Sequence, residues 1–119
     1  MERTGEIEFV VEWTITGDIA EFERLARQAA EMVRSEEPRA SRYLWYRDAE
    51  RRTFLLTECY ADSEAMLAHG RNIARLLPAL SAVARVTRFE ILGDLSPEAE
   101  AAAAAIGAKR FRSFGGVSR

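Results

Sequence analysis

Three side chains capable of acid–base chemistry fall close together in the middle of the sequence. Residues 53–60 alternate between apolar and polar types as a β-strand does, which places Glu58 and Tyr60 on the same face. Asp62 is a good helix-capping type, and the helix that it predicts carries His69, the only histidine of the chain. One strand-to-helix corner is therefore expected to bring together a carboxylate, a phenol and an imidazole. Paired with Glu58, His69 could take a proton from a bound ligand.

Hydrophobic periodicity predicts the elements that must position this corner. Residues 6–16 alternate strictly, whereas the segments that follow Asp18 and Asp62 carry apolar residues at helical spacing. Gly70 and Pro78 indicate that the second helix is divided into two pieces. The expected elements are strands over 6–16, 42–47, 53–60 and 85–92 and helices over 19–37, 63–80 and 97–106.

The order of these elements predicts the fold. A βαββαβ order is that of a ferredoxin-like α+β fold, in which a four-stranded antiparallel sheet carries both helices on one face. We predict a single domain over residues 1–119, with its core in 6–92 and a C-terminal helix and tail in 94–119.

The hairpin between the second and third strands decides which side chains share a face with the carboxylate. Residues 48–51 are polar and of hairpin length, and a symmetric turn would place Trp45 opposite Phe54 and Tyr43 opposite Leu56. Between this face and the helices we expect a chamber suited to a flat aromatic ligand. The alternative is that the same side chains form an ordinary core. The candidate catalytic residues are His69 and Glu58, and the candidate ligand contacts are Trp13, Tyr43, Trp45, Phe54, Tyr60, Met66 and Asn72.

The opposite face of the predicted sheet is expected to pack against a second copy of the chain. Its apolar members are Val10, Leu44, Tyr46, Leu55 and Val86, and its charged members are Glu8, Glu12, Arg42, Arg88 and Glu90. An apolar patch of this size is unusual on a monomer, and face-to-face packing would bury roughly 1,600 Å². The arginines could then neutralise the glutamates. A homodimer through the sheet face is therefore predicted.

Composition argues against several classes of function. The formal net charge is -2, whereas a nucleic-acid-binding domain is normally basic. No apolar segment reaches the ~20 residues of a membrane span, and the acidic N-terminus is unlike a signal peptide. Cys59 is the only cysteine, which fits a reducing cytoplasm and leaves no set of metal ligands. There is no glycine-rich phosphate loop or dinucleotide fingerprint. We expect a cytoplasmic protein that uses no metal and no cofactor.

Two segments resemble the antibiotic biosynthesis monooxygenase domain. Residues 58–69 begin with the letters ECYADSEA and end at His69, and they resemble the family signature E-x-Y-x-D-x-x-A-x-x-x-H. Glu37-Pro38 followed by Tyr43 is similar to the family segment E-P-x-x-x-x-Y. The resemblance covers roughly residues 6–92, and the C-terminal tail is similar to that of a bacterial subgroup of quinol monooxygenase-like proteins.

The resemblance implies a dimeric α/β barrel that oxidises a small quinol or polycyclic phenol with O₂, without metal or flavin. In such enzymes the carbanion of the substrate itself reduces oxygen. His69 would be the base or polar contact, Glu58 its orienter or a second base, and Tyr43, Trp45 and Tyr60 would hold the ring system. The heme-degrading branch of the family uses an asparagine in the first strand, which residues 6–16 lack. The same fold also occurs in binding and stress-response proteins that catalyse no reaction. The first alternative is therefore a non-catalytic dimer that binds a hydrophobic aromatic ligand. The second is a dimer whose pocket is filled by its own side chains.

Overall fold

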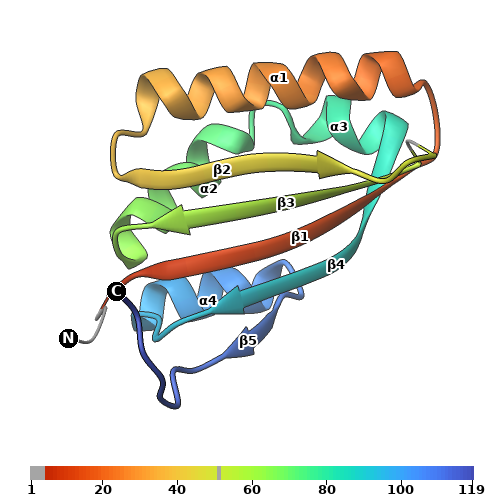
Figure 1. Ribbon diagram of the computed structural model, residues 1–119. Coiled ribbons are helices and arrows are strands. Elements are labelled where there is room, and N and C mark those ends of the chain that lie inside the picture. The colour runs from red at the N-terminus through yellow and green to blue at the C-terminus, as the bar shows by residue number, and fades with distance from the viewer. Residues whose placement is uncertain (1–4, 51) are drawn as a thin grey trace.

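The computed structural model describes residues 5–50 and 52–119, and Figure 1 shows the arrangement of the elements. The predictions made for residues 1–4, and for Arg51 in the expected hairpin turn, lie outside the described residues. The strands are β1 (Ile7–Ile15), β2 (Ala40–Arg47), β3 (Thr53–Tyr60), β4 (Ala84–Leu92) and β5 (Lys109–Phe111). The helices are α1 (Ile19–Glu36), α2 (Ser63–Ile73), α3 (Leu77–Val83) and α4 (Pro97–Ala105).

The predicted ferredoxin-like α+β fold is confirmed, with one strand more than expected. The sheet has the order β2-β3-β1-β4-β5. The first four strands pair antiparallel, and β5 lies parallel to β4. The sequence did not predict β5, because three exposed residues are too few to show an alternation. The pairing is parallel because α4 carries the chain back along the sheet before β5 begins.

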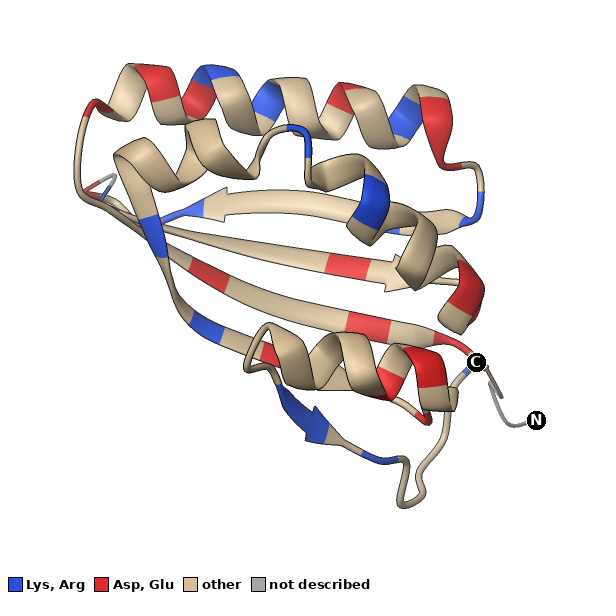
Figure 2. Ribbon diagram, turned by 180° about the vertical axis from the view of Figure 1, so that it is seen from behind, with Lys and Arg blue, Asp and Glu red and all other residues tan. Residues whose placement is uncertain are grey.

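All the helices lie on one face of the sheet, as the two opposite views of the ribbon show (Figures 1 and 2). The central strand β1 buries every second residue, which confirms the predicted alternation. Ala99 and Ala103 of the alanine-rich α4 are fully buried, so this helix packs closely. The core of the protein is therefore enclosed between the sheet and its helices, where the predicted chamber would lie.

The second predicted helix is divided in two, as expected. Asp62 accepts a hydrogen bond from the Ala65 N–H at 2.9 Å, so α2 begins where the sequence placed it. The interruption falls at residues 74–76, with Pro78 in the first turn of α3, whereas Gly70 is helical. This leaves His69 in the last part of α2, close to the end of α1.

The hairpin pairing differs from the predicted one by two residues. Trp45 lies opposite Leu56 and not opposite Phe54. The Asp48 N–H donates to the Thr53 carbonyl oxygen at 3.0 Å, so the turn begins one residue later than a symmetric 48–51 turn. A shift of two residues keeps each side chain on its face, so the grouping of the aromatic residues survives the error.

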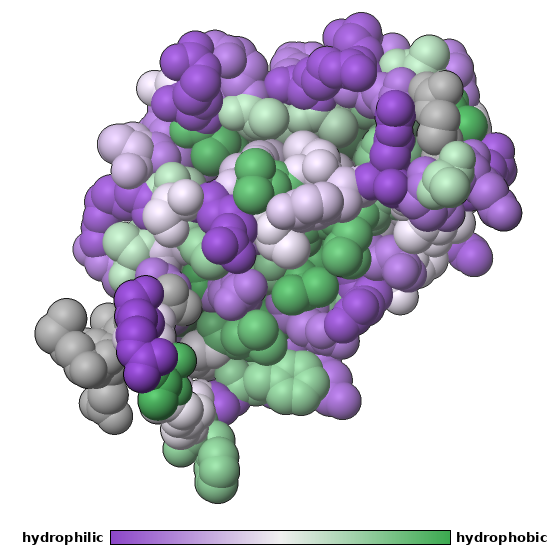
Figure 3. Space-filling view, in the orientation of Figure 1, coloured by the Kyte–Doolittle hydropathy of each residue, from purple (hydrophilic) through white to green (hydrophobic). Residues whose placement is uncertain are grey.

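The other face of the sheet carries no helix, and Figure 3 shows apolar side chains gathered across its centre. Leu44 and Tyr46 are 49% and 53% exposed there. The prediction that Val86 lies on this face was wrong, because a bulge in the pairing of β1 with β4 places it opposite Trp13, on the helix side. Thr87 takes its place and hydrogen-bonds to side chains of β1.

Candidate active site

Glu58 and His69 meet inside the protein, between β3 and α2. They are 3% and 4% exposed, and Oε1 of Glu58 lies 3.4 Å from Nε2 of His69. Tyr60, two residues further along the same strand face, donates its hydroxyl hydrogen to the same carboxylate oxygen. The three side chains that were expected at one strand-to-helix corner are therefore in contact.

A second carboxylate, which the sequence analysis did not assign to the site, lies on the other side of the imidazole. Glu37 is only 7% exposed, and its Oε1 and Oε2 lie 2.9 and 3.1 Å from Nδ1 of His69. Asn72, predicted as a ligand contact, donates from Nδ2 to Oε2 of Glu37 at 3.1 Å. The signal that could have found this residue was the Glu37-Pro38 pair, which was used only for the family resemblance.

Pro38 explains why this carboxylate turns inward. The residue before a proline disfavours helical angles, and Glu37 accordingly has φ -128° and ψ 73°. Its N–H closes α1 by donating to the Val33 carbonyl oxygen at 2.9 Å. The chain thus leaves α1 at the point from which the Glu37 side chain can reach His69 of α2.

Tyr43 completes the group around the imidazole. It lies opposite Glu58 in the sheet, and not opposite Leu56 as predicted. The ring centre of Tyr43 lies 5.4 Å from that of His69, and the ring centre of Tyr60 lies 5.3 Å from that of His69. We call Glu37, Tyr43, Glu58, Tyr60 and His69 the ionisable cluster.

The two carboxyl groups of the ionisable cluster have opposite pKa shifts. Burial raises the pKa of Glu58, and the charge of His69 and the hydrogen bond from Tyr60 only partly offset this. Burial also acts to raise the pKa of Glu37, but the hydrogen bonds and charges of His69, Asn72 and Arg75 outweigh it and lower that pKa. Compared with exposed carboxyl groups, Glu37 therefore favours its ionised form more strongly and Glu58 favours its neutral form more strongly.

The two ring nitrogens of His69 face different carboxyl groups. Nδ1 lies within hydrogen-bond distance of Glu37, and Nε2 faces the carboxyl group of Glu58. A carboxylate that holds one tautomer of an imidazole in place is the arrangement that orients a general base. Burial, followed by the nearby carboxylates, raises the pKa of both Tyr43 and Tyr60, so both remain neutral phenols. The cluster can therefore accept one proton at Nε2 and exchange it with Glu58.

Most of the other predicted ligand contacts form a separate group around Phe22 of α1. Phe22 is fully buried, and its ring centre lies 5.8, 5.7 and 4.9 Å from those of Trp13, Trp45 and Phe54. We call these four residues the aromatic cluster. The interior beside these rings is thus occupied by a side chain of the protein itself.

The structure places the remaining candidates in the same core. Met66 of α2 is 5% exposed and belongs to the hydrophobic core. Tyr43 connects the two clusters, because its ring centre lies 6.1 Å from that of Trp45 as well as beside His69. The assignment of these residues to ligand binding stays a prediction.

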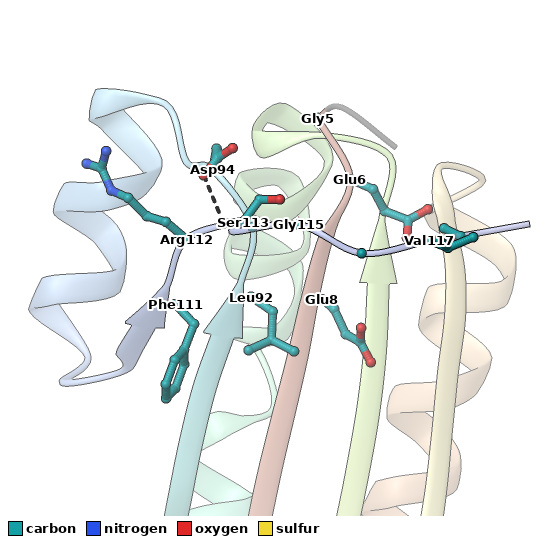
Figure 4. A pocket seen from close by; sticks show the side chains of 13 residues that line it. Gly5, Glu6, Glu8, Leu92, Asp94, Phe111, Arg112, Ser113, Gly115 and Val117 are labelled. Carbon is teal, nitrogen blue, oxygen red and sulfur yellow. Dashed lines mark hydrogen bonds between the residues drawn. The ribbon is translucent and has the colours of Figure 1, made fainter. Parts of the chain in front are cut away.

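Two hollows open on the surface away from the ionisable cluster. A groove of about 240 Å³ lies between α1 and β2, with Trp45 and Phe54 in its wall. A recess of about 630 Å³ lies where the C-terminal tail crosses the ends of β1 and β4, and Figure 4 shows Glu8 and Leu92 beneath the tail there. Neither hollow includes His69 or Glu58 in its lining.

Neither a cluster of metal-binding side chains nor a membrane-spanning helix is found among the described residues. Within 5–50 and 52–119, no group of three or more His, Cys, Asp or Glu side chains is placed to hold a metal ion. No helix in this part of the chain is long and apolar enough to cross a lipid bilayer. Cys59 is buried on β3, on the face opposite to that of Glu58.

The structure is thus a ferredoxin-like α+β fold with a buried histidine between two carboxyl groups, enclosed between sheet and helices. Residues 10–76 match the family described as antibiotic biosynthesis monooxygenase, and this is more than half of the 119 residues. The chain belongs to this family. A comparison with curated protein sequences found no match.

Solved structures share the fold at low sequence identity. MupZ from Pseudomonas fluorescens is 21% identical with a TM-score of 0.83, over 98% of this chain and 96% of that one. SnoaB from Streptomyces nogalater, described as a cofactor-independent oxygenase, is 20% identical with a TM-score of 0.66, over 74% and 91%. A conserved protein from Methanosarcina mazei is 20% identical with a TM-score of 0.63, over 75% and 90%. The extent of the match to MupZ shows that the C-terminal helix and tail also have a structural counterpart.

Proposed function

We propose that the protein is a cofactor-independent monooxygenase that oxidises a small quinol or polycyclic phenol with O₂. The observation that carries this proposal is the buried His69, held at Nδ1 by Glu37 and facing Glu58 at Nε2. A structural core has no need of two carboxyl groups around one imidazole, because burying such groups is costly. Membership of the antibiotic biosynthesis monooxygenase family and the likeness to SnoaB support the same reaction.

In the proposed reaction the protein supplies a proton acceptor and a dry environment. His69 takes the phenolic proton at Nε2, Glu37 stabilises the imidazolium that forms, and Glu58 exchanges protons with Nε2. The resulting electron-rich carbanion of the substrate reduces O₂. In the simplest balanced case a CH₂ group becomes a carbonyl, one oxygen atom enters the product and the other leaves as water. The substrate supplies all the electrons, so the chain needs no redox group of its own.

Oxygen uptake with a panel of hydroquinones, naphthols and anthrones tests this proposal. We expect at least one member to be consumed faster than in buffer, and His69→Ala to lower that rate at least tenfold, since general base catalysis contributes about 10²–10⁴-fold. Glu64→Gln, on the exposed side of the same helix, is the matched control and should keep the rate. If no panel member is oxidised above the uncatalysed rate, the proposal is wrong.

The second candidate is a protein that binds an aromatic ligand without turning it over. The groove between α1 and β2 favours this candidate, because Trp45 and Phe54 line it while neither His69 nor Glu58 does. It predicts that panel members raise the melting temperature while oxygen uptake stays at the level of buffer. Turnover that depends on His69 would exclude it.

We also propose that two copies of the chain pack through the face of the sheet that carries no helix. Leu44 and Tyr46 are exposed there, and Oγ1 of Thr57, on the same face, is buried without a partner among the described residues. Light scattering after size exclusion should give a dimer that Leu44→Glu converts to a monomer. Leu77→Glu changes an exposed leucine of α3 instead and should leave the dimer intact. A monomeric wild-type protein would contradict the proposal.

We further expect the chain to act in the cytoplasm as one domain. Its single cysteine favours a reducing compartment, and β5 attaches the C-terminal segment to the same sheet as the core. Cell fractionation and a single cooperative unfolding transition would test these two expectations, and a separate transition for the tail would contradict the second.

A further inference from the structure

The groove between α1 and β2 has the composition of a small ligand site. Its volume of about 240 Å³ is below the ~300–1,000 Å³ of sites for drug-sized ligands, so it suits a molecule of one or two rings. The sheet contributes the rings of Trp45 and Phe54 to its wall, and α1 contributes the small side chains of Ala26 and Ala30. A flat aromatic ring can lie against such a wall, because the alanines leave space opposite the aromatic side chains.

Trp45, which lines the groove, carries a hydrogen-bond donor that no described residue uses. Nε1 of Trp45 is buried and has no partner among the residues described. A buried indole N–H normally finds an acceptor, so an unmatched one calls for an explanation. Nε1 itself is covered, but Trp45 as a whole is only half-buried, so a turn of its side chain would be needed to present the N–H to a ligand oxygen.

The rim of the groove is basic. Arg27 and Arg47 line it from α1 and β2, against one acidic residue, Glu23. Arg47 reaches across from the strand to the helix and donates from Nη1 to Oε2 of Glu23 at 2.7 Å. Two arginines against one glutamate leave an excess of positive charge, which favours a ligand that carries a negative charge.

The groove is separated from the ionisable cluster by only two packed ring contacts. The Trp45 ring in its wall contacts Tyr43, and Tyr43 contacts His69, at ring-centre distances of 6.1 and 5.4 Å. We propose that the groove between α1 and β2 is a recognition subsite for an aromatic ligand, and that the Trp45 side chain turns on binding so that its Nε1–H donates to an acidic oxygen of the ligand. The inference rests on the proposed function for the oxidation of this ligand, but its binding can be measured separately.

Binding of 1-hydroxy-2-naphthoate to the full chain under nitrogen tests the subsite, with naphthalene as the uncharged comparison. Trp45→Phe keeps a ring but removes the donor, and should weaken the naphthoate about three- to tenfold while changing naphthalene little. Ala30→Leu fills the groove and should weaken both compounds at least tenfold. Phe114→Leu changes a fully exposed aromatic residue of the tail that does not line the groove, and should leave both affinities as they are.

The outcomes separate this inference from the proposed function. The inference is overturned if the wild type binds neither compound, or if Ala30→Leu and Trp45→Phe bind the naphthoate as tightly as the wild type. If these variants lose binding while no oxygen uptake is found with any substrate, the subsite stands and the monooxygenase proposal fails. If oxygen uptake depends on His69 but is indifferent to Ala30→Leu, the monooxygenase proposal stands and the subsite fails.

Discussion

The aromatic cluster and the ionisable cluster fill neighbouring parts of one interior, but they are held together by different forces. Around Phe22 the contacts are between rings, and no charged group takes part. Around His69 the contacts are polar: Nδ1 is hydrogen-bonded to Glu37 and Nε2 lies 3.4 Å from Glu58, and each carboxyl group is less than 10% exposed. The first arrangement gains stability from the removal of apolar surface from water, whereas the second must first offset the cost of desolvating its charges.

This difference separates the part of the interior that maintains the fold from the part that can do chemistry. A ring cluster has the same energy at every pH, since nothing in it titrates. The ionisable cluster changes its charge with pH, and the opposite pKa shifts of Glu37 and Glu58 mean that its two halves respond in opposite directions. Stability measured against pH can therefore distinguish the two clusters.

The largest effect is expected from Phe22→Ala. Loss of a buried phenylalanine leaves a cavity among the three rings it contacts, and we expect the free energy of unfolding to fall by about 4 kcal/mol. Urea unfolding at pH 5 and pH 8 should show the same loss at both values. Phe114→Ala, at a fully exposed position of the tail, is the control and should change little. A loss that differed between the two pH values would break the proposed separation of the clusters.

Glu37→Gln should have a smaller effect that depends on pH. The pKa of Glu37 is lowered from 4.5 in the folded chain, so its contribution to stability is present above about pH 4.5 and is lost as pH falls through the lowered value. At pH 7 we expect Glu37→Gln to lower the free energy of unfolding by about 2 kcal/mol, because the charge that accepts the His69 Nδ1–H is gone. Wild type and variant should converge in acid.

Glu36→Gln provides the matched control for that experiment. Glu36 is the neighbouring residue at the end of α1, and it forms an exposed ion pair with Arg75 at 2.9 Å. Exposed pairs contribute little, so this variant should unfold like the wild type at each pH. Equal losses for the two variants would mean that the burial of Glu37 has no energetic consequence.

The fold was largely predictable because it rests on periodic patterns. The alternation of β1 and the capping residue Asp62 needed no knowledge of the rest of the chain. The predicted hairpin register was wrong because the register depends on which residues close the turn. Asp48 and Thr53 close it, but the neighbouring polar residues were equally plausible from the sequence. The three-residue β5 gave no pattern at all.

The site was only partly predictable, because its partners come from different elements. Glu58 and His69 lie on neighbouring elements, so their proximity followed from the strand-to-helix corner. Glu37 is 32 residues from His69 in the sequence and belongs to the site only because α1 ends beside α2. Phe22 lies in the segment after Asp18 that has apolar residues at helical spacing, but its position among the rings of Trp13 and Phe54 could be known only from the packing.

The smallest expected effect comes from Glu58→Gln, and its sign is the reverse of that for Glu37. The pKa of Glu58 is raised above 4.5 in the folded chain. As pH rises above about 4.5, the unfolded chain therefore loses this proton before the folded chain does, and the free energy of unfolding of the wild type falls. Glutamine has nearly the same shape but cannot ionise, so the variant lacks this loss of stability. We expect Glu58→Gln to match the wild type near pH 4 and to exceed it by about 1 kcal/mol at pH 8.

This last variant also distinguishes a structural role from a catalytic one. If Glu58 only fills space, a variant that is more stable at pH 8 should keep whatever oxygen uptake the wild type has. If Glu58 exchanges protons with His69 during the reaction, the same variant should gain stability and lose at least tenfold in rate, since an amide cannot take up or release that proton at these pH values. A gain in stability joined to a loss of rate would explain why a carboxyl group occupies a position where it weakens the fold.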